Sequence, residues 1–254
     1  EGMMILRHVL KPDRVVLAVE DNKAEAIKIL HGLHDRYPDI EIAVLPTRYP
    51  QGAEKQLIQS LTKREIAPGQ LPVSVGCAVF NAATCKAIHD AVYEGMPLVK
   101  RIVTVSGDIC MEPKNLMVPL GVDFNTLIDA CGTSENPYKV LSGGPMMGTA
   151  MYTLDVPVQK TSSAILAFAE DEVEQFESSP CIRCGRCVAA CPSHLVPQKL
   201  ELAARMFDNE AFEKLSGMEC YECGSCTYVC PAGRRLTQAL KQTRRAVLDA
   251  RRKK

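Results

Sequence analysis

Eight of the twelve cysteines fall into two copies of one pattern that can bind iron–sulfur clusters. The first copy reads Cys181-x2-Cys184-x2-Cys187-x3-Cys191-Pro192. The second reads Cys220-x2-Cys223-x2-Cys226-x3-Cys230-Pro231 and begins 39 residues later. This spacing is typical of proteins with two [4Fe–4S] clusters, in which three cysteines of a run bind one cluster and the fourth binds the other. A zinc ribbon, the alternative, needs two separated pairs of thiolates and fits the pattern less well.

The spacing assigns each cysteine to one of two ligand sets. The first cluster takes Cys181, Cys184, Cys187 and Cys230, and the second takes Cys220, Cys223, Cys226 and Cys191. Two such clusters predict one-electron transfer as the reaction class. Arg183 and Arg186 lie between ligands of the first run, where the second run has Glu222 and Ser225. Since positive charge favours the more negative, reduced cluster, we expect the first cluster to have the higher potential.

The remaining cysteines and the histidines indicate no second site. Cys77, Cys85, Cys110 and Cys131 lack ligand spacing, and we expect them to be buried, inert thiols. The five histidines form no obvious ligand set, and no hydrolytic motif stands out. Thirty basic and 30 acidic residues cancel, which excludes a globally basic nucleic-acid binder, so we predict no nucleic-acid partner.

Before these cysteine runs, residues 13–100 alternate strand and helix signals, which predict a parallel α/β layer. Apolar runs at 15–19 and 42–45 are typical of buried strands, and residues 24–30 and 52–64 have helical spacing. We expect a third strand at 73–75 and a helix from about 82 to 94, capped by Asn81. The chain starts without Met, as if inside a helix that ends near residue 10, so we expect a truncated N-terminus.

Residues 101–169 predict a small α+β module, with strands at 102–105, 115–120, 138–141 and 164–168 around a helix at 124–130. Residues 170–180 hold five acids and end in Ser-Ser-Pro, which indicates a solvated linker. The cluster domain, 181–254, is predicted to be helical because apolar residues between its two cysteine runs recur at helical spacing.

The cluster domain is basic, with 14 Lys and Arg against 7 Asp and Glu. Its basic tail, 241–254, is predicted to be either a solvated tail or a docking segment for an acidic partner or an anionic membrane surface. The longest charge-free stretch, Ile66 to Cys85, has 20 residues, which is nominally enough to span a bilayer. Its prolines and glycines favour a loop–strand–loop instead, and we predict no transmembrane segment in this chain.

Three segments together resemble the RnfC family, the peripheral subunit of the Rnf electron-transport complex. They are Tyr49-Pro50-Gln51-Gly52, Gly143-Gly144-Pro145-Met146-Met147-Gly148 and the two cysteine runs. This family is in turn similar to the NADH-binding flavoprotein subunit of respiratory complex I. The resemblance implies a Rossmann-like flavin/NADH domain over 1–100 and a soluble-ligand-binding β-grasp module over 101–169. After the linker at 170–180, it implies a helical ferredoxin domain with two clusters over 181–254.

The resemblance also implies FMN and NAD(H), together with the residues that line their pocket. The corresponding residues in this sequence are Tyr49, Gly52 and Glu54 in one segment, and Asn81 and Thr84 in another. Gly52 would allow close backbone approach, and Asn81 and Thr84 would donate hydrogen bonds to the flavin. Ala53 stands where the family has a glutamate, and the family's glycine-rich phosphate loop has no match in this chain.

The function implied is that of an electron-transfer subunit in a membrane-associated, ion-translocating ferredoxin:NAD⁺ oxidoreductase. Single electrons would pass between a ferredoxin-like partner and flavin/NAD through the two clusters. The implied partners are the other subunits of the complex, and the implied location is peripheral, at the cytoplasmic face of the cell membrane. Two alternatives stay open: the related cobalamin reductase of propanediol-utilisation microcompartments, and a non-catalytic electron wire without flavin chemistry.

Overall fold

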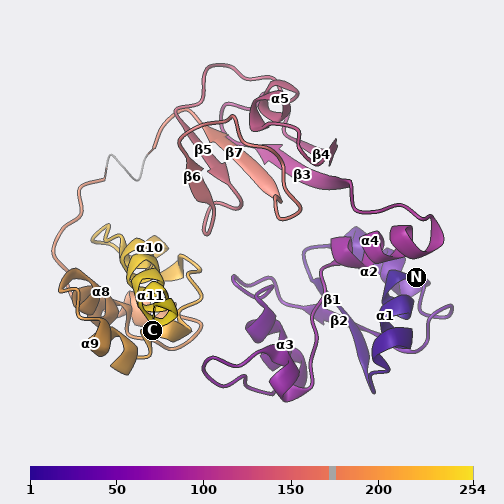
Figure 1. Cartoon of the computed structure of the whole chain (residues 1–254), viewed down its shortest axis with the longest axis horizontal. Helices are drawn as coiled ribbons and strands as arrows, with labels where there is room; N and C mark the ends of the chain where they lie inside the picture. The colour runs from indigo at the N-terminus through magenta and orange to yellow at the C-terminus, as the bar shows by residue number, and fades with distance from the viewer. Residues whose placement is uncertain (172–175, 254) are drawn as a thin grey trace. The chain divides into compact units, whose positions relative to one another are not determined.

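The chain divides into two compact units, Glu1–Pro97 and Leu98–Lys254, in a computed structural model. The structure describes residues 1–171 and 176–253 (Figure 1). Residues 172–175, which belong to the expected acidic linker, and Lys254 of the basic tail lie outside the described residues.

Unit 1 begins with helix α1 (Gly2–Leu10), which is followed by two parallel strands. Strand β1 (Val15–Glu20) pairs with β2 (Ile40–Leu45), residue by residue along their whole length. Helix α2 (Ala24–Gly32) makes the crossover that a parallel pair requires. The predicted alternation of strand and helix is confirmed here, and so is the helix that ends near residue 10.

The second half of unit 1 consists of helices and loops. Helix α3 (Glu54–Thr62) and helix α4 (Ala82–Tyr93) follow the prediction, except that the side chain of Asn81 makes no capping hydrogen bond. The third strand, expected at 73–75, is wrong, because these residues form a 3-10 turn, η1 (Pro72–Val75). Pro72 sets a helical φ at the start of the turn. Gly76, with a φ of 67°, ends it after four residues, so no extended run develops.

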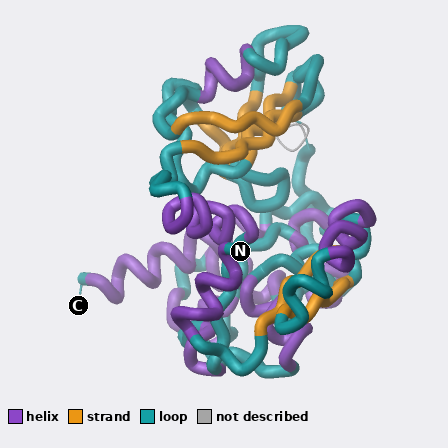
Figure 2. The backbone as a smooth tube through the Cα atoms, turned by 90° about the vertical axis from the view of Figure 1, so that its right-hand side faces the viewer, coloured by secondary structure: helices purple, strands orange, loops and turns teal. Residues whose placement is uncertain are grey.

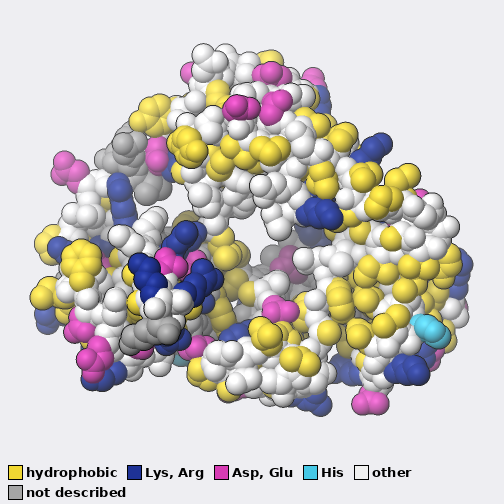
Figure 3. Space-filling view, viewed as in Figure 1, with side chains coloured by type: hydrophobic (Ala, Val, Ile, Leu, Met, Phe, Trp, Pro, Cys, Tyr) yellow, Lys and Arg dark blue, Asp and Glu magenta, His cyan; other side chains and the backbone are white. Residues whose placement is uncertain are grey.

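Unit 1 buries few of its own side chains. Among the described residues, Gly2 and Ile58 are the only ones of this unit that are buried, and both strands are at best half-buried. Gly2 lets α1 pack directly on the backbone of Cys85 in α4. Apolar side chains such as Val9 and Ile29 lie exposed on the helices, and Figure 3 shows many such side chains over this unit. A parallel sheet is normally covered on both faces, so unit 1 exposes surface that this kind of layer usually buries.

Unit 2 begins with a mixed five-stranded sheet. Its strands are β3 (Lys100–Ser106), β4 (Lys114–Pro119), β5 (Lys139–Ser142), β6 (Thr149–Met151) and β7 (Ala164–Phe168). The order across the sheet is β4-β3-β7-β5-β6, and the pair β3–β7 is parallel while the other pairs are antiparallel. The α+β prediction is confirmed, although the three-residue strand β6 was not predicted.

Helix α5 (Phe124–Asp129) supplies the core of this sheet with apolar side chains. Phe124 of the helix, Val103 and Val105 of β3, and Ile165 of β7 are almost fully buried. The helix begins where it does because the Asp123 carboxylate accepts a hydrogen bond from the Thr126 backbone N–H at 2.7 Å.

The described part of the chain after the sheet is helical, as predicted. Its elements are α7 (Arg186–Ala189), α8 (Pro197–Arg205), α9 (Asn209–Lys214), η2 (Gly217–Glu219), α10 (Ser225–Tyr228) and α11 (Leu236–Arg252). Figure 2 shows α11 as the long helix that leads to the C-terminus. Leu200, Phe212 and Leu240 form a second core, separate from that of the sheet.

No helix within residues 1–171 and 176–253 is both long and apolar enough to cross a bilayer. The charge-free stretch from Ile66 to Cys85 forms loops, the turn η1 and the start of α4.

Candidate iron–sulfur sites

Two cavities in the helical part of unit 2 are each lined by four cysteines. The first cysteine cavity is lined by Cys181, Cys184, Cys187 and Cys230. The second cysteine cavity is lined by Cys220, Cys223, Cys226 and Cys191. Each cavity therefore takes three thiols from one run and the fourth thiol from the other. The metal that these thiols bind stays a prediction.

The turns that carry the cysteines have the same backbone in both runs. Gly185 and Gly224, with φ of 77° and 85°, precede the short helices α7 and α10. Arg183 and Glu222 both have a φ of 57°. Their backbone N–H groups donate to Sγ of the first cysteine of their own run, at 3.4 Å in each case. The 39-residue repeat of the sequence is thus also a repeat of local structure.

The helix after each run adds a polar side chain to the third cysteine. Sγ of Cys187 lies 3.2 Å from Oε1 of Gln198, in the first turn of α8. Sγ of Cys226 lies 3.5 Å from Oγ1 of Thr237, in the first turn of α11. Hydrogen bonds donated to ligand sulfurs tune iron–sulfur centres. The Thr237 hydroxyl can donate such a bond, whereas at Cys187 the thiol is the donor and Oε1 of Gln198 is the acceptor. Gln198 and Thr237 were not predicted, but they also stand 39 residues apart, so extending the repeat past the Cys-Pro pairs would have found them.

The two cavities differ in access to solvent. Cys181 and Cys184 of the first are exposed, whereas Cys223 and Cys226 of the second are buried. Burial raises the pKa of Cys220 to about 11 and also raises the pKa of Cys226. Because thiols bind metal as thiolates, these buried thiols need a nearby positive charge, such as that of iron, to ionise at neutral pH.

Arg234 forms part of the wall of the first cysteine cavity. Its Nη2 donates to both carboxylate oxygens of Glu201, at 2.6 Å each. Its Nε is buried and has no hydrogen-bond partner among the described residues. Glu201, and to a smaller extent the thiols of Cys181 and Cys230, raise the pKa of Arg234. A buried, unpaired donor beside four thiols fits an anionic group in this cavity, and a sulfide-bridged cluster held by thiolates is such a group.

The charged residues within the runs are arranged differently from what their sequence positions imply. Arg183 and Arg186 are exposed, so solvent and salt screen their effect on the cavity. Glu222 pairs with Arg244 at 2.7 Å, which offsets its negative charge beside the second run. If the first cluster has the higher potential, as predicted, the difference therefore has to come from charges other than those of Arg183, Arg186 and Glu222.

The basic tail is helical as far as Arg252, with Thr243 and Val247 buried and several of its basic side chains exposed. Arg245 and Arg252 on α11 have side chains that are 85% and 82% exposed, and both lie near Asp249 on the same helix. Figure 3 shows Lys and Arg side chains gathered over α10 and α11.

The five residues expected to line a flavin pocket lie at the starts of two helices of unit 1. Tyr49 and Gly52 lie in the loop after β2, and Glu54 is the first residue of α3. Asn81 precedes α4, and Thr84 lies in its first turn. The first of these segments lies between the carboxyl end of a strand and the N-terminus of a helix, which is typical of ligand sites in parallel α/β layers. The second segment follows the turn η1 and a loop. None of these five described residues lines either cysteine cavity.

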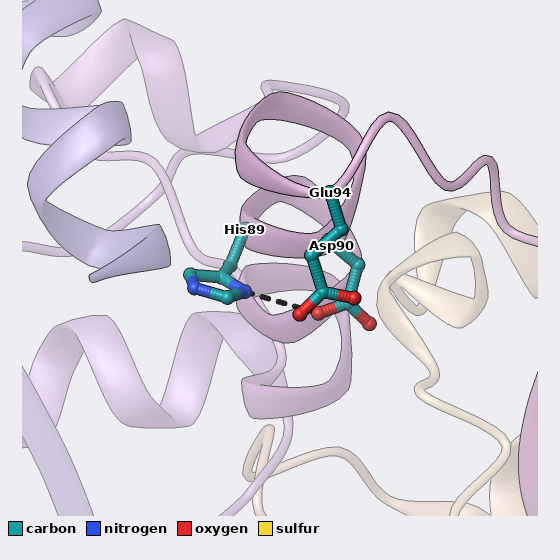
Figure 4. A group of neighbouring side chains, drawn as sticks. All are labelled: His89, Asp90 and Glu94. Atoms are coloured by element: carbon teal, nitrogen blue, oxygen red, sulfur yellow. Dashed lines mark hydrogen bonds and ion pairs between the residues drawn. The ribbon is translucent and has the colours of Figure 1, made fainter.

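His89, Asp90 and Glu94 form the one cluster of candidate metal ligands that the described residues offer outside the cysteine runs (Figure 4). The Asp90 carboxylate is already engaged, by Lys86 Nζ at 2.6 Å and by His89 Nδ1 at 3.0 Å. The pKa of Asp90 is lowered by Lys86 and by His89. The group is therefore explained as an ion-pair cluster on α4, without a metal.

The four cysteines outside the runs are only partly as expected. Cys110 and Cys131 are buried in the core of the sheet, as predicted. Cys77 and Cys85 are half-buried, so the expectation of full burial is wrong for them. Cys77 follows the turn η1, which stays near the surface of a unit with little core, and Cys85 lies under α1.

Two family models match the chain. One is described as the Nuo51 FMN-binding domain and matches residues 1–90. The other is described as a 4Fe-4S dicluster domain and matches residues 169–236. The second match contains both cysteine runs.

Several curated proteins are similar over most of this chain. The C subunit of a proton-translocating ferredoxin:NAD(+) oxidoreductase complex from Clostridium ljungdahlii is 46% identical over 202 residues, which is 79% of this chain and 44% of that protein. Its counterpart in a Na(+)-translocating ferredoxin:NAD(+) oxidoreductase complex from Acetobacterium woodii is 40% identical over 77% of this chain and 44% of its own length. The C subunit of an ion-translocating oxidoreductase complex from Yersinia pestis is 42% identical over 80% of this chain and 33% of its own length.

Among solved structures, a chain of an NAD+-reducing [NiFe]-hydrogenase has a similar fold. The TM-score is 0.61 at 20% identity, and the match covers 96% of this chain and 51% of that one. The chain spans less than half the length of the curated relatives described above. Over that length, it belongs to the family of the C subunits of ion-translocating ferredoxin:NAD⁺ oxidoreductase complexes.

Proposed function

We propose that the eight cysteines of the two runs hold two [4Fe–4S] clusters. The first cysteine cavity takes one cluster and the second takes the other, so that Cys230 and Cys191 each cross to the other run's cluster. The observation that carries this proposal is the grouping of four thiols around each cavity, three from one run and one from the other. The match to a dicluster domain over residues 169–236 supports it independently.

Clusters of this kind accept and release single electrons. The chain's own residues hold the thiolates at fixed positions through the paired turns, and they donate backbone N–H groups to Sγ of Cys181 and Cys220. At the second cavity, Cys223 and Cys226 are buried. We therefore propose that this chain is the electron-transferring part of a C subunit, and that its complex passes single electrons between a ferredoxin-like partner and flavin/NAD.

The difference in exposure suggests a direction for contact with partners. The first cysteine cavity has an exposed rim, which includes Ile182 at 65% exposure together with Arg183 and Arg186. An apolar side chain beside basic ones suits an acidic electron carrier or a neighbouring subunit of the complex. The cluster of the second cavity, where Cys223 and Cys226 are buried, would exchange electrons mainly with the cluster of the first cavity.

Unit 1 is proposed to belong to a Rossmann-like flavin/NADH domain, and the sheet of unit 2 to be a β-grasp module. The match to an FMN-binding domain over residues 1–90 supports the first assignment. FMN and NAD(H) would contact Tyr49, Gly52, Glu54, Asn81 and Thr84. The proposed domain boundaries stay those of the sequence, at 1–100, 101–169 and 181–254, with an acidic linker at 170–180.

The proposed location is the cytoplasmic face of the cell membrane, where a peripheral subunit meets the membrane subunits of its complex. The names of the relatives differ in the ion translocated, protons in one and Na⁺ in another. The ion is therefore not part of this proposal.

Metal analysis and electron paramagnetic resonance (EPR) spectroscopy of the anaerobically purified chain test the cluster assignment. We expect about eight irons per chain and two interacting paramagnetic centres after reduction. Cys184→Ala should reduce the iron content to about four, whereas Cys77→Ala, the matched control outside both cavities, should leave it unchanged. About two zinc ions per chain in place of iron would overturn the assignment.

Release of flavin on denaturation tests the role of unit 1. Fluorescent flavin in the supernatant, lost in an Asn81→Ala variant but not in a Cys77→Ala variant, would support the proposed site. A chain that holds full iron and no flavin would instead favour an electron wire.

A further inference from the structure

The 39-residue repeat breaks at one buried pair of side chains. At the first cysteine cavity, Arg234 and Glu201 form an ion pair whose side chains are 14% and 12% exposed. The residues 39 positions away are Leu195 and Leu240, counted back from Arg234 and forward from Glu201. These two leucines line the second cysteine cavity and are 7% and 1% exposed. The first cavity therefore has Arg234 in its wall, paired with Glu201, where the second cavity has two leucines.

The backbone of the ligand turns is the same at the two cavities. Both turns have a glycine before the short helix and a residue of positive φ two positions earlier. The N–H···S contact has the same length, 3.4 Å, in both turns. Each third cysteine has one polar neighbour on the following helix. The exchange of Arg234 for Leu195 is thus a buried change in charge between two cavities that otherwise share these features.

Arg234 is placed to act on whatever the first cysteine cavity holds. It lines that cavity, and its buried Nε is left without a partner among the residues described, since Glu201 engages Nη2. Glu201 on α8 keeps the guanidinium from turning away. Solvent screens the charge of Arg234 far less than it screens the charges of the exposed Arg183 and Arg186.

We propose that Arg234, held by Glu201, is a positioning residue that favours the reduced state of the cluster in the first cysteine cavity. This inference rests on the proposed two-cluster function. An electron shared between the clusters would then settle in the first cavity: the second cluster is oxidised by one electron and the first is reduced by one, with no proton or other reactant. The solvent-accessible cavity would be the one that retains the electron for a partner.

The test compares EPR-monitored redox titrations of the iron-loaded chain with those of two variants. Glu201→Leu with Arg234→Leu copies the apolar pair of the second cavity, and such replacements of a buried ion pair often leave folding intact. We expect the first cluster's potential to fall. The equilibrium constant for electron transfer between the clusters should change at least about tenfold, which is about 59 mV for one electron. Glu201→Gln should shift the same potential upward, because the guanidinium loses its counter-charge.

Arg205→Leu is the matched control. Arg205 also contacts Glu201, at 4.0 Å, but its side chain is 67% exposed and is not among the described residues that line either cavity. This variant should leave both potentials unchanged. Titration in a Cys223→Ala background, where only the first cavity keeps four cysteines, identifies the cluster that shifts.

The outcomes separate this inference from the proposed function. A chain without iron would overturn the function itself. Full iron content with unshifted potentials in both Glu201 variants would overturn only the inference and leave Arg234 and Glu201 as a structural link between α8 and the second run. An equal shift in Arg205→Leu would also overturn it, because the effect would then be one of general charge. Should the double variant lose iron, the upward shift in Glu201→Gln decides.

Discussion

Gly185 and Gly224 offer a direct test of how the two ligand turns are packed. They occupy equivalent positions of the repeat and have similar φ angles, 77° and 85°. Their surroundings differ. A Cβ on Gly185 would meet none of the described residues within 4 Å, whereas a Cβ on Gly224 would lie 2.7 Å from the backbone oxygen of Met146. Met146 belongs to the Gly-Gly-Pro-Met-Met-Gly segment between β5 and β6.

The expected costs follow from these two environments. Alanine at either position has to adopt a left-handed backbone conformation, which costs about 1–2 kcal/mol. At Gly224 the Met146 backbone also has to move, and overpacking of this kind costs about 1–3 kcal/mol more. We therefore expect Gly185→Ala to destabilise the iron-loaded chain by about 1–2 kcal/mol and Gly224→Ala by about 2–5 kcal/mol.

The assay is anaerobic urea unfolding of both variants, followed by the visible absorbance of the clusters and by circular dichroism. Bound clusters can make unfolding depart from two states, so midpoints are compared under identical conditions. Adding Met146→Ala to Gly224→Ala should restore little, because the close contact is with the backbone oxygen and not with the side chain. Equal loss of stability in Gly185→Ala and Gly224→Ala would refute the claim that this segment packs on the second ligand turn.

Three further predictions concern single residues. Cys191→Ala and Cys230→Ala should each reduce the iron content from about eight to about four. Cys191→Ala should remove the same EPR signal as replacement of the buried Cys223 or Cys226. Removal of the signal from the first cavity instead would contradict the crossed ligation. Asp208→Ala should lower the free energy of unfolding in urea by about 1 kcal/mol. The reason is that the Asp208 carboxylate accepts a hydrogen bond from the Ala211 N–H at 2.9 Å at the start of α9. An equal loss in Asp208→Asn would argue against capping. The pKa of Asp123 is lowered, mainly by the hydrogen bond from the Thr126 backbone N–H. The ionised carboxylate therefore stabilises the folded chain above the pKa that Asp123 has in the unfolded chain, and this stabilisation is lost as the pH falls through its pKa in the folded chain. The unfolding midpoint of Asp123→Asn should therefore depend less on acid pH than that of the parent chain.

The sequence predicted most elements because burial is reflected in residue type. The apolar run at 164–168 is β7, which is buried on alternate residues. The run at 15–19 is β1, a strand as predicted, but it is only half-buried, so its expected burial is wrong. The same reasoning fails for short elements. The valines of η1 suggested a strand, but three residues cannot outweigh a preceding proline and a following left-handed glycine. Strand β6 spans only Thr149–Met151, which is too short for a pattern of period two to appear.

The ligand cysteines could be proposed from spacing alone, because three thiols two residues apart are a local property of the chain. Their surroundings could not be inferred in this way. Glu201 and Arg234 are joined only because α8 packs beside the turn that follows Cys230. Likewise, Arg244 of α11 reaches Glu222, which lies 22 residues away in the second run. Contacts of this kind depend on how the two halves of the repeat fold onto each other, which a linear pattern does not encode.

This distinction changes how the charge of the cluster domain is understood. The excess of basic residues in 181–254 suggests a general offset to anionic clusters, yet two of its arginines are committed to individual carboxylates at 2.6 and 2.7 Å. At the second run, Arg244 cancels an acid that would otherwise oppose reduction. At the first cavity, Arg234 keeps a buried donor unpaired among the described residues even while it binds Glu201. Because buried charges interact more strongly than exposed ones, these two local arrangements should decide how the clusters differ, and the exposed arginines of the tail should matter more for contact with partners.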